Sequence, residues 1–261
     1  MKHIAIIICL VMLSACAAKA PSRVARHVEG ERTQDAANIE KRLSAFRSAT
    51  PTLKGLAWVE FRTGDEEQRT EAALALKRPS EIRIDAMDAL ADVWAQAGSD
   101  GKRLWLFIPS KGKLYVGRAS SYTLHKLAKF DWEPSELVEI VMGAPPLGAR
   151  QEVVQVGEKS DRHFAAEGSG IHIWTEGAKN RIAKCVRYAE DGVTKDYEIS
   201  FSDYKRLGGI DFPYKIEALF PGRGARFLIE YRDLELGGSV QASAFAPPEK
   251  RARKSEKVGA E

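Results

Sequence analysis

Carboxylates, serines and histidines are the residues of this sequence that could do acid–base, nucleophilic or metal chemistry. Their spacing argues against acid–base and nucleophilic catalysis. Asp65, Glu66 and Glu67 are adjacent carboxylates, but three in a row between strand-like segments are typical of a solvated hairpin turn. The chain contains no Gly-x-Ser-x-Gly nucleophile elbow. Since no set of residues converges on a nucleophile and a general base, we predict that the protein is not an enzyme.

The histidines do not have the spacing of a known metal motif. Zinc motifs place two histidines four residues apart on a helix or combine them with a Cys-x-x-Cys pair. Four histidines show neither arrangement and lie far apart in the sequence: His27, His125, His163 and His172. The sequence therefore predicts no metal site and no cofactor.

The first residues of the chain have the pattern of a secretory signal. A basic start is followed by an apolar run from Ile4 to Leu13 and by the small residues Ser14 and Ala15, directly before Cys16. The apolar run is about half of the roughly 20 residues that a membrane-spanning helix needs. Residues 1–15 are therefore predicted to be a signal peptide and not a mature membrane span.

Cys16 stands in a sequence, Leu13-Ser14-Ala15-Cys16, that resembles the bacterial lipobox. The resemblance implies cleavage before Cys16 and lipidation of its thiol. Each buried acyl methylene contributes about 0.8 kcal/mol of membrane affinity, so two or more chains anchor a protein stably. Ala17, where retained lipoproteins have Asp, implies the periplasmic face of the outer membrane. An ordinary signal peptide with a chance cysteine is the alternative.

Charge and the remaining cysteine narrow the class of protein further. The formal net charge is +4 and the basic residues are scattered, which is not the pattern of a nucleic-acid binder. Cys185 lies in the strand-like run 182–186 and has no cysteine left to pair with, so we expect a packed, unreactive thiol.

The elements that must position these residues form a mostly β domain. Residues 16–32 lack an apolar period and are predicted to be a tether, and residues 34–48 have the apolar spacing of an amphipathic helix. Segments of alternating apolar and polar residues, separated by turn residues, predict an antiparallel meander. These segments are 57–62, 74–76, 81–86, 104–108, 114–116, 197–201, 214–218 and 227–231.

One stretch interrupts the strands. Residues 122–142 have the periodicity of one or two amphipathic helices. Residues 249–261 are highly charged and are predicted to be a disordered tail. A mostly β (α+β) domain with a single, helix-covered curved sheet over residues 33–248 accounts best for this order of elements.

Three stretches, in their order along the chain, resemble the LolA/LolB superfamily of periplasmic lipoprotein carriers and outer-membrane lipoprotein receptors. They are Leu76-Lys77-Arg78-Pro79 before the strand 81–86, Ser99-Asp100-Gly101-Lys102-Arg103-Leu104-Trp105, and residues 134–146. The resemblance implies an open, incomplete antiparallel β-barrel of about 10–11 strands, with an N-terminal helix and an inserted helical lid. In that family the cavity between sheet and lid holds acyl chains.

The resemblance assigns expected positions to the cavity and the lid. The cavity lining is predicted to be Val59, Phe61, Leu74, Leu76, Ile82, Ile84, Leu104 and Leu106. The lid is predicted to present Leu124, Leu127, Phe130, Trp132, Leu137, Ile140 and Val141.

Two further sites follow from the same resemblance. Arg78 matches a family arginine that latches the lid, although a surface arginine before a turn-forming proline is an equal alternative. Met87 and Leu90 lie in a strand-to-strand segment that matches the receptor's membrane-facing loop, and packing at the barrel rim is its alternative.

The sequence departs from both branches of the family. The carrier has no lipid cysteine, so Cys16 favours the membrane-tethered receptor, whereas the motifs around Arg78 and Lys102 favour the carrier. We expect an outer-membrane lipoprotein that binds the acyl chains of lipoproteins or lipids and assists their transfer, with a periplasmic carrier protein as a candidate partner. The alternative is a non-enzymatic structural or assembly lipoprotein that binds an envelope protein, because fold alone does not decide function.

Overall fold

The computed structural model describes residues 30–64, 66–129, 131–148, 151–249 and 252–258. The predicted signal peptide, Cys16, most of the predicted tether and Phe130 lie outside these residues. The α-helices are α1 (Gln34–Ala49), α2 (Ser121–Ala128) and α3 (Pro134–Val141). Short 3-10 turns are η1 (Pro109–Lys111), η2 (Lys159–Asp161), η3 (Pro221–Arg223) and η4 (Ala242–Phe245).

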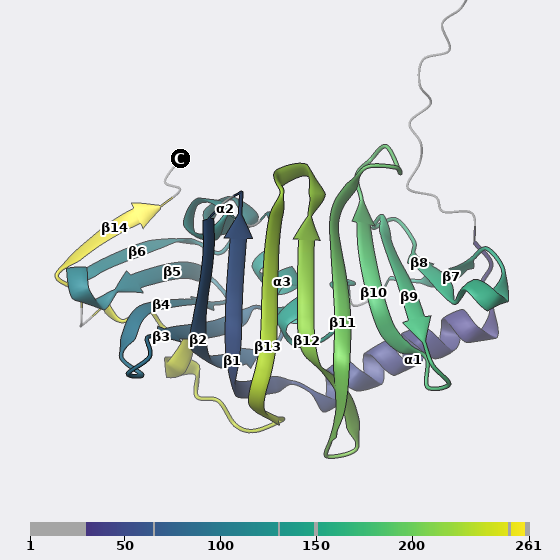
Figure 1. Cartoon of the computed structure of the whole chain (residues 1–261), viewed down its shortest axis with the longest axis horizontal. Coiled ribbons are helices and arrows are strands. Elements are labelled where there is room, and N and C mark those ends of the chain that lie inside the picture. The colour runs from purple at the N-terminus through teal and green to yellow at the C-terminus, as the bar shows by residue number, and fades with distance from the viewer. Residues whose placement is uncertain (1–29, 65, 130, 149–150, 250–251, 259–261) are drawn as a thin grey trace, which may run out of the picture.

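The strands form one large open sheet, shown in Figure 1. They are β1 (Thr52–Thr63), β2 (Glu66–Lys77), β3 (Glu81–Met87), β4 (Val93–Asp100), β5 (Arg103–Ile108), β6 (Lys113–Arg118), β7 (Val153–Val156), β8 (His163–Ala166), β9 (Ile171–Glu176), β10 (Arg181–Tyr188), β11 (Lys195–Leu207), β12 (Ile210–Phe220), β13 (Ala225–Leu236) and β14 (Lys254–Val258). Their order across the sheet is β14-β6-β5-β4-β3-β2-β1-β13-β12-β11-β10-β9-β8-β7.

Two antiparallel meanders meet at the centre of this sheet. β1 pairs with β2 on one side and with β13 on the other, so the first and last long strands of the domain are neighbours. In the register, Val59 lies opposite Ile229 of β13 and Thr70 of β2. The predicted fold class, a mostly β and incompletely closed barrel with helices, is confirmed.

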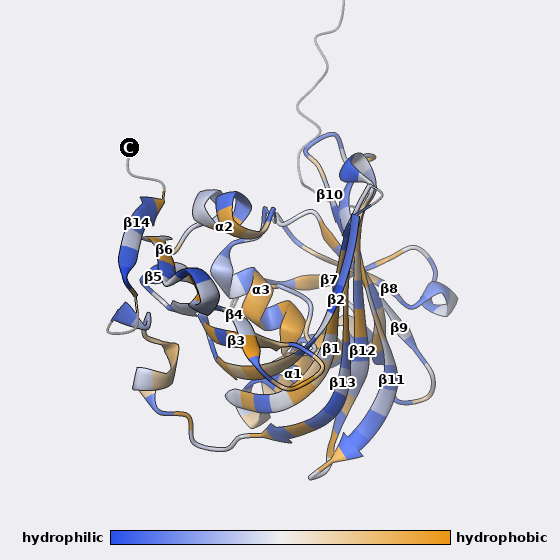
Figure 2. Cartoon of the chain, turned by 60° about the vertical axis from the view of Figure 1, so that its left-hand side comes forward, coloured by the Kyte–Doolittle hydropathy of each residue, from blue (hydrophilic) through white to orange (hydrophobic). Residues whose placement is uncertain are grey.

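The topology explains why α2 and α3 cover the sheet. Apart from the appended β14, β6 and β7 are the outermost strands of the two meanders, yet they are joined directly through the chain. The connection must therefore cross from one edge of the sheet to the other, and α2 and α3 lie on this crossing. In Figure 2 the apolar surface of α3 lies inside the curve of the sheet.

The helices agree with their sequence signals. Thr33 caps α1, because its Oγ1 accepts a hydrogen bond from the amide of Ala36 at 3.2 Å. α3 begins with Pro134 and has a capping box in which the Glu136 side chain accepts from the amide of Glu133 at 2.9 Å. Residues 122–142 thus form two helices. None of the helices within the described ranges has the length and apolar composition to cross a bilayer.

The sheet has fourteen strands, more than the ten or eleven expected, for two reasons. β7 and β8 have only four residues each, too short for a clear alternation. The prediction of disorder for residues 249–261 is wrong for Lys254–Val258, which pair in parallel with β6 as β14. β14 buries no side chain, so its position depends on backbone hydrogen bonds and on ion pairs such as Lys113–Glu256, which hydropathy does not reveal.

The main core lies between the concave face of the sheet and the helices, where α1, α2, α3 and eleven of the strands contribute to one apolar cluster. A second, small cluster of Trp105, Phe107 and Leu114 lies on the opposite face of β5 and β6. The Trp105 Nε1–H donates to the carbonyl of the fully buried Phe245 at 2.9 Å. The segment after β13 that contains η4, which we call the C-terminal arm, therefore covers this second cluster.

Candidate functional site

The predicted lining residues share the concave face of the sheet. Their side chains alternate with outward ones along β1, β2, β3 and β5, as strand geometry requires. Leu74, Leu76, Ile82 and Leu104 are buried in the main cluster, and Val59, Phe61 and Ile84 are partly buried against it. Leu106 is half-buried and lies outside both apolar clusters of the described residues. That these side chains line an acyl-chain cavity stays a prediction.

The predicted lid residues face the same cluster from the other side. Leu124 of α2 is buried, and Leu127 is partly buried against the core. Trp132, which follows α2, is fully buried, and its ring lies 5.1 Å from that of Phe220 between centroids. Leu137, Ile140 and Val141 of α3 are also buried. The structure therefore brings the two predicted sets of residues into direct contact.

Polar contacts hold α3 against the meander formed by β7 to β13. Arg187 of β10 donates to Glu136 with a distance of 2.6 Å between Nη1 and Oε1. The hydroxyl of Tyr231 on β13 donates to the carbonyl of Val141 at 2.6 Å. These contacts and the apolar packing define a closed position of α3.

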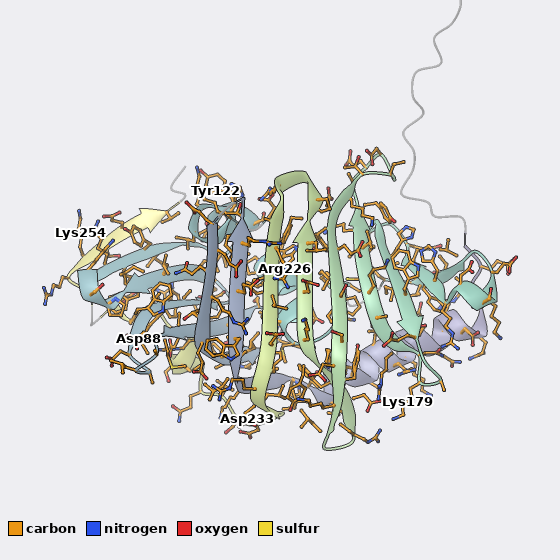
Figure 3. All side chains as sticks on the ribbon, in the orientation of Figure 1. Asp88, Tyr122, Lys179, Arg226, Asp233 and Lys254 are labelled. Atoms are coloured by element: carbon orange, nitrogen blue, oxygen red, sulfur yellow. The ribbon has the colours of Figure 1, made fainter. Side chains whose placement is uncertain are left out.

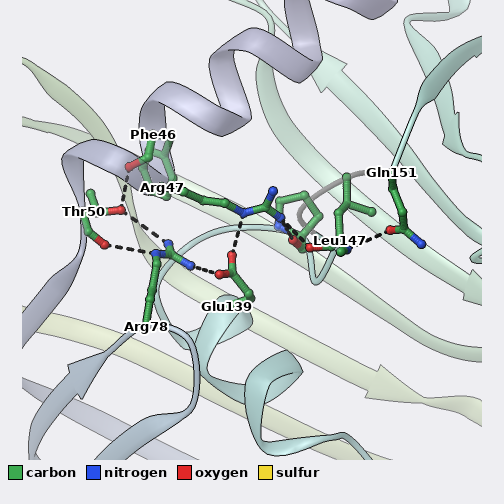
Figure 4. Close-up of polar contacts among 9 residues, drawn as sticks. Phe46, Arg47, Thr50, Arg78, Glu139, Leu147 and Gln151 are labelled. Atoms are coloured by element: carbon green, nitrogen blue, oxygen red, sulfur yellow. Dashed lines mark hydrogen bonds and ion pairs between the residues drawn. The ribbon is translucent and has the colours of Figure 1, made fainter.

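Arg78 is the residue that fastens α3 to the turn between β2 and β3, as Figure 4 shows. Its Nη1 forms an ion pair with Glu139 of α3, and its Nε donates to the carbonyl of Thr50 at 3.0 Å. Arg47 of α1 binds the other carboxylate oxygen of Glu139, with 3.0 Å between Nε and Oε2. Arg47 Nη2 also donates to the carbonyl of Leu147 at 2.9 Å.

This cluster joins segments far apart in the sequence, and we refer to Arg47, Thr50, Arg78 and Glu139 as the latch cluster. Arg78 and Glu139 are only 11% and 14% exposed. Burial lowers the pKa of the Arg78 guanidinium, and the carboxylate of Glu139 opposes that shift. An arginine keeps its charge under such a shift. Arg78 and Glu139 therefore form a shielded ion pair between the β2–β3 turn and α3. The sequence pointed to Arg78 through the family resemblance but not to its partners.

Two pockets open beside the latch cluster. One, of about 510 Å³, is lined by residues of α3 and the following loop, by Arg47 and by Arg187. The other, of about 540 Å³, lies between α1 and residues 147, 148 and 151–153. Both pockets are partly open to solvent.

The loop between β3 and β4 presents one apolar side chain to solvent. Leu90 is 84% exposed, whereas Met87, the last residue of β3, is half-buried. The Asp88 carboxylate accepts from the amides of Leu90 and Asp92 at 2.9 and 3.0 Å, which fixes the turn. Figure 3 labels Asp88 at this corner of the molecule. The structure thus exposes Leu90 and not Met87, and the membrane-facing role of both residues stays a prediction.

Cys185 is packed as the sequence predicts, whereas two of the histidines lie closer together than their spacing in the sequence suggests. Cys185 is completely buried, and burial raises the pKa of its thiol, so a thiolate nucleophile is disfavoured there. Within the described residues, no group of three or more metal-ligand side chains gathers. His163 and His172, however, lie together: β8 and β9 form a hairpin, and the distance from His163 Nε2 to His172 Nδ1 is 2.8 Å.

The fold is LolA/LolB-like, as three solved structures show. A DUF1329 family protein from Desulfovibrio piger superposes with a TM-score of 0.61 at 11% identity, covering 83% of this chain and 98% of that one. A putative outer membrane lipoprotein-sorting protein domain from Vibrio parahaemolyticus gives 0.56 at 12% identity, covering 80% and 94%.

A LolA superfamily protein from Nitrosomonas europaea gives a TM-score of 0.55 at 13% identity and covers 81% of this chain and 97% of that one. No family model matches the sequence, and no curated protein does. At such low identity these likenesses establish the fold, and the function needs its own argument.

Proposed function

We propose that this protein binds the acyl chains of lipoproteins or lipids between the concave face of its sheet and the helices α2 and α3, and assists their transfer to the outer membrane. The observation that carries the proposal is the apolar concave face, covered by a helix that polar contacts hold in place. The lipoprotein-sorting name of one structural neighbour supports the same class of ligand.

Acyl chains must replace α3, or part of it, on the sheet. Leu137, Val138, Ile140 and Val141 are all buried, and burial of four such side chains is worth roughly 6–12 kcal/mol. A single long acyl chain gains on the order of 10 kcal/mol when it leaves water. Because the two quantities are similar, exchange is energetically feasible. A contact of a few kcal/mol, such as the latch cluster, can then decide between the closed and loaded states.

The route for the chains begins where the apolar surface is incompletely covered. Val59, Phe61 and Ile84 of the sheet and Leu127 of α2 are among the partly buried side chains that pack against the core. Partly exposed apolar side chains at the margin of a buried apolar face offer a first contact for a fatty tail.

Binding can be tested with a fluorescent palmitoyl probe and a pair of substitutions on one strand. Phe61→Asp places a charge on the concave face of β1 and should weaken probe binding at least about tenfold, since a carboxylate is poorly tolerated beside an acyl chain. Leu56→Asp is the matched control, because Leu56 is 39% exposed on the same strand and lies outside the core cluster. Equal binding by both variants and the wild type would contradict the proposed site.

The latch cluster makes a second test. Arg78→Leu should favour the open state, and we expect a changed rate of probe release, measured by stopped-flow competition. Arg69→Leu is the control, since Arg69 is 47% exposed and pairs with Glu60 and Glu230 away from α3. Identical release rates for wild type and Arg78→Leu would leave Arg78 with a purely structural role.

Delivery to membranes depends, in this proposal, on the lipid at Cys16 and on Leu90. Leu90→Glu should leave folding and probe binding unchanged but slow transfer of the probe to phospholipid vesicles, because the exposed leucine can no longer enter the interface. Val193→Glu, at another loop where the side chain is 79% exposed, is the control. Unchanged transfer by Leu90→Glu would remove the loop from the mechanism.

The alternative of a structural lipoprotein that binds an envelope protein would need a continuous apolar patch outside the fold. On the outer face the exposed Leu56, Trp58 and Leu219 stand among ion-paired charges such as Arg226 and Glu217. The described residues therefore favour ligand binding on the inside.

A further inference from the structure

His163 and His172 form a pair on the outer face of the sheet, opposite to the face that carries Phe164, Ile171 and Ile173 of the main core. The hairpin between β8 and β9 turns through Gly168 and Gly170, both of which have positive φ, 70° and 68°. This register places His163 opposite Trp174 and His172 opposite Ala165, so the two histidines are diagonal neighbours on one face. Their facing nitrogens are 2.8 Å apart.

Neighbouring aromatic rings hold both imidazoles in place. His163 stacks on Trp174 with 4.3 Å between centroids and 7° between planes. The Tyr188 ring meets His172 edge-on at 5.0 Å. Both histidines are half-buried, so neither side chain is enclosed in the core. The pair is thus positioned in advance, which lowers the entropic cost of binding a ligand between the rings.

We propose that His163 and His172 together bind one Zn²⁺ ion on the outside of the β8–β10 region, with water completing the coordination. Imidazole nitrogens bind zinc at about 2.0–2.1 Å, which places two adjacent ligands of a tetrahedral ion about 3.3 Å apart. The rings must therefore separate by only about half an ångström from their present contact.

Protons and charges are consistent with this site. A neutral imidazole carries one N–H, and in the present contact one ring donates to the other. Zinc needs a lone pair on both facing nitrogens, so the proton of the donating ring moves to the other nitrogen of that ring. His163 Nδ1 and His172 Nε2 then carry the two N–H groups, without net proton release. Burial lowers the pKa of His163 and of His172, which keeps both rings neutral at neutral pH.

Two charged neighbours modulate the affinity in opposite directions. The Asp161 carboxylate favours a positive charge on the His163 ring, and the Lys184 ammonium, 4.5 Å from the centroid of the Trp174 ring, disfavours it. Asp161 already accepts from the amide of Glu158 at 3.1 Å, so it acts as a nearby charge and not as a third ligand. Two protein ligands imply a weak, exchangeable site.

The test uses the full chain and ZnCl₂, with isothermal titration for affinity and ¹⁵N NMR of the histidine rings for the site. We expect wild type to bind one ion at the pair, with shifts at His163 Nε2 and His172 Nδ1. His163→Gln and His172→Gln should each weaken binding about tenfold or more, since a single imidazole remains. His125→Gln is the control, because His125 lies on α2, outside the pair.

Lys184→Met tests whether a cation binds between the two histidines, because the Lys184 ammonium should repel such a cation. Removal of the ammonium should strengthen Zn²⁺ binding roughly fivefold, because a nearby like charge no longer repels the ion. If the ring nitrogens of wild type do not shift at millimolar zinc, or if His163→Gln binds as tightly as wild type, the proposal is overturned. The NMR readout is made on wild type, so it decides even if a glutamine variant fails to fold.

Discussion

The two faces of the central strands, β2, β1, β13 and β12, differ in composition and in what covers them. The concave face is apolar and is covered by α3, with Val138 and Ile140 completely buried. The convex face carries ion pairs between neighbouring strands, among them Arg226–Glu217 and Lys215–Glu230. Figure 3, which views the sheet broadside, labels Arg226 on β13.

The comparison shows where a ligand can compete with the protein's own contacts. Charged side chains on the convex face are satisfied by one another and by water, so this face needs no cover. The concave face must be covered by something apolar, and α3 supplies that cover in the closed state. In the proposed function, a fatty chain makes the same kind of apolar contact as α3 and takes its place on the sheet.

The largest expected effect comes from placing a charge on the covered face. Ile140→Asp should lower the free energy of unfolding by about 4 kcal/mol or more, because a carboxylate would be buried without a partner. Leu219→Asp, on the convex side of β12, should change it by less than about 1 kcal/mol. Urea unfolding measures both, and similar losses would mean that the two faces do not differ as described.

The outward side of β5 and β6 is an exception to this comparison, because it carries a small apolar cluster. Phe245→Ala removes a side chain that contributes to the cover of that cluster. Phe245 is fully buried there, and the Trp105 indole donates to its carbonyl. We expect a loss of about 3 kcal/mol from the cavity that remains. Hydrogen exchange should show increased opening of β3, β4 and β5, which η4 contacts. If exchange there were unchanged, the C-terminal arm would not be the cover of this cluster.

Glu139→Gln tests the polar edge of the covered face. The substitution leaves the charges of Arg47 and Arg78 without their carboxylate, so we expect a loss of about 1–3 kcal/mol. Amides of α3 should exchange faster, while those of β11 and β12 should not. Glu133→Gln, at the solvent-exposed start of α3, is the matched control. Equal protection of α3 in all three proteins would show that the latch cluster does not hold the helix.

The sequence predicted which face each strand residue occupies better than it predicted long-range partners. Leu74, Leu76 and Ile82 share the concave face because a period of two leaves no other choice within a strand. The run 104–108 is apolar on both faces, and its outward cover, Phe245, is 140 residues from Trp105 in the sequence. No local pattern contains such a pairing, and the same holds for Glu139 and Arg78.

The histidine pair was a different kind of omission. Motif spacing does not relate His163 to His172, but Gly168-Ser169-Gly170 between them has the composition of a hairpin turn. A hairpin turn between two strands brings residues on either side of it onto adjacent strands. Applying that rule to the two histidines would have predicted their proximity.

The smallest expected effect lies in the ion pairs of the convex face. Glu230 lies 3.2 Å from Arg69 and 3.3 Å from Lys215, and all three side chains are substantially exposed. Glu230→Gln should therefore lower the free energy of unfolding by no more than about 1 kcal/mol at low salt. The difference from wild type should largely vanish near 1 M salt, where the Debye length falls to about 3 Å. Urea titrations at low and high salt measure this. If Glu230→Gln lost much more free energy of unfolding than this, and lost it also at high salt, the ion pairs of the convex face would be as important for stability as the packing of α3 on the concave face.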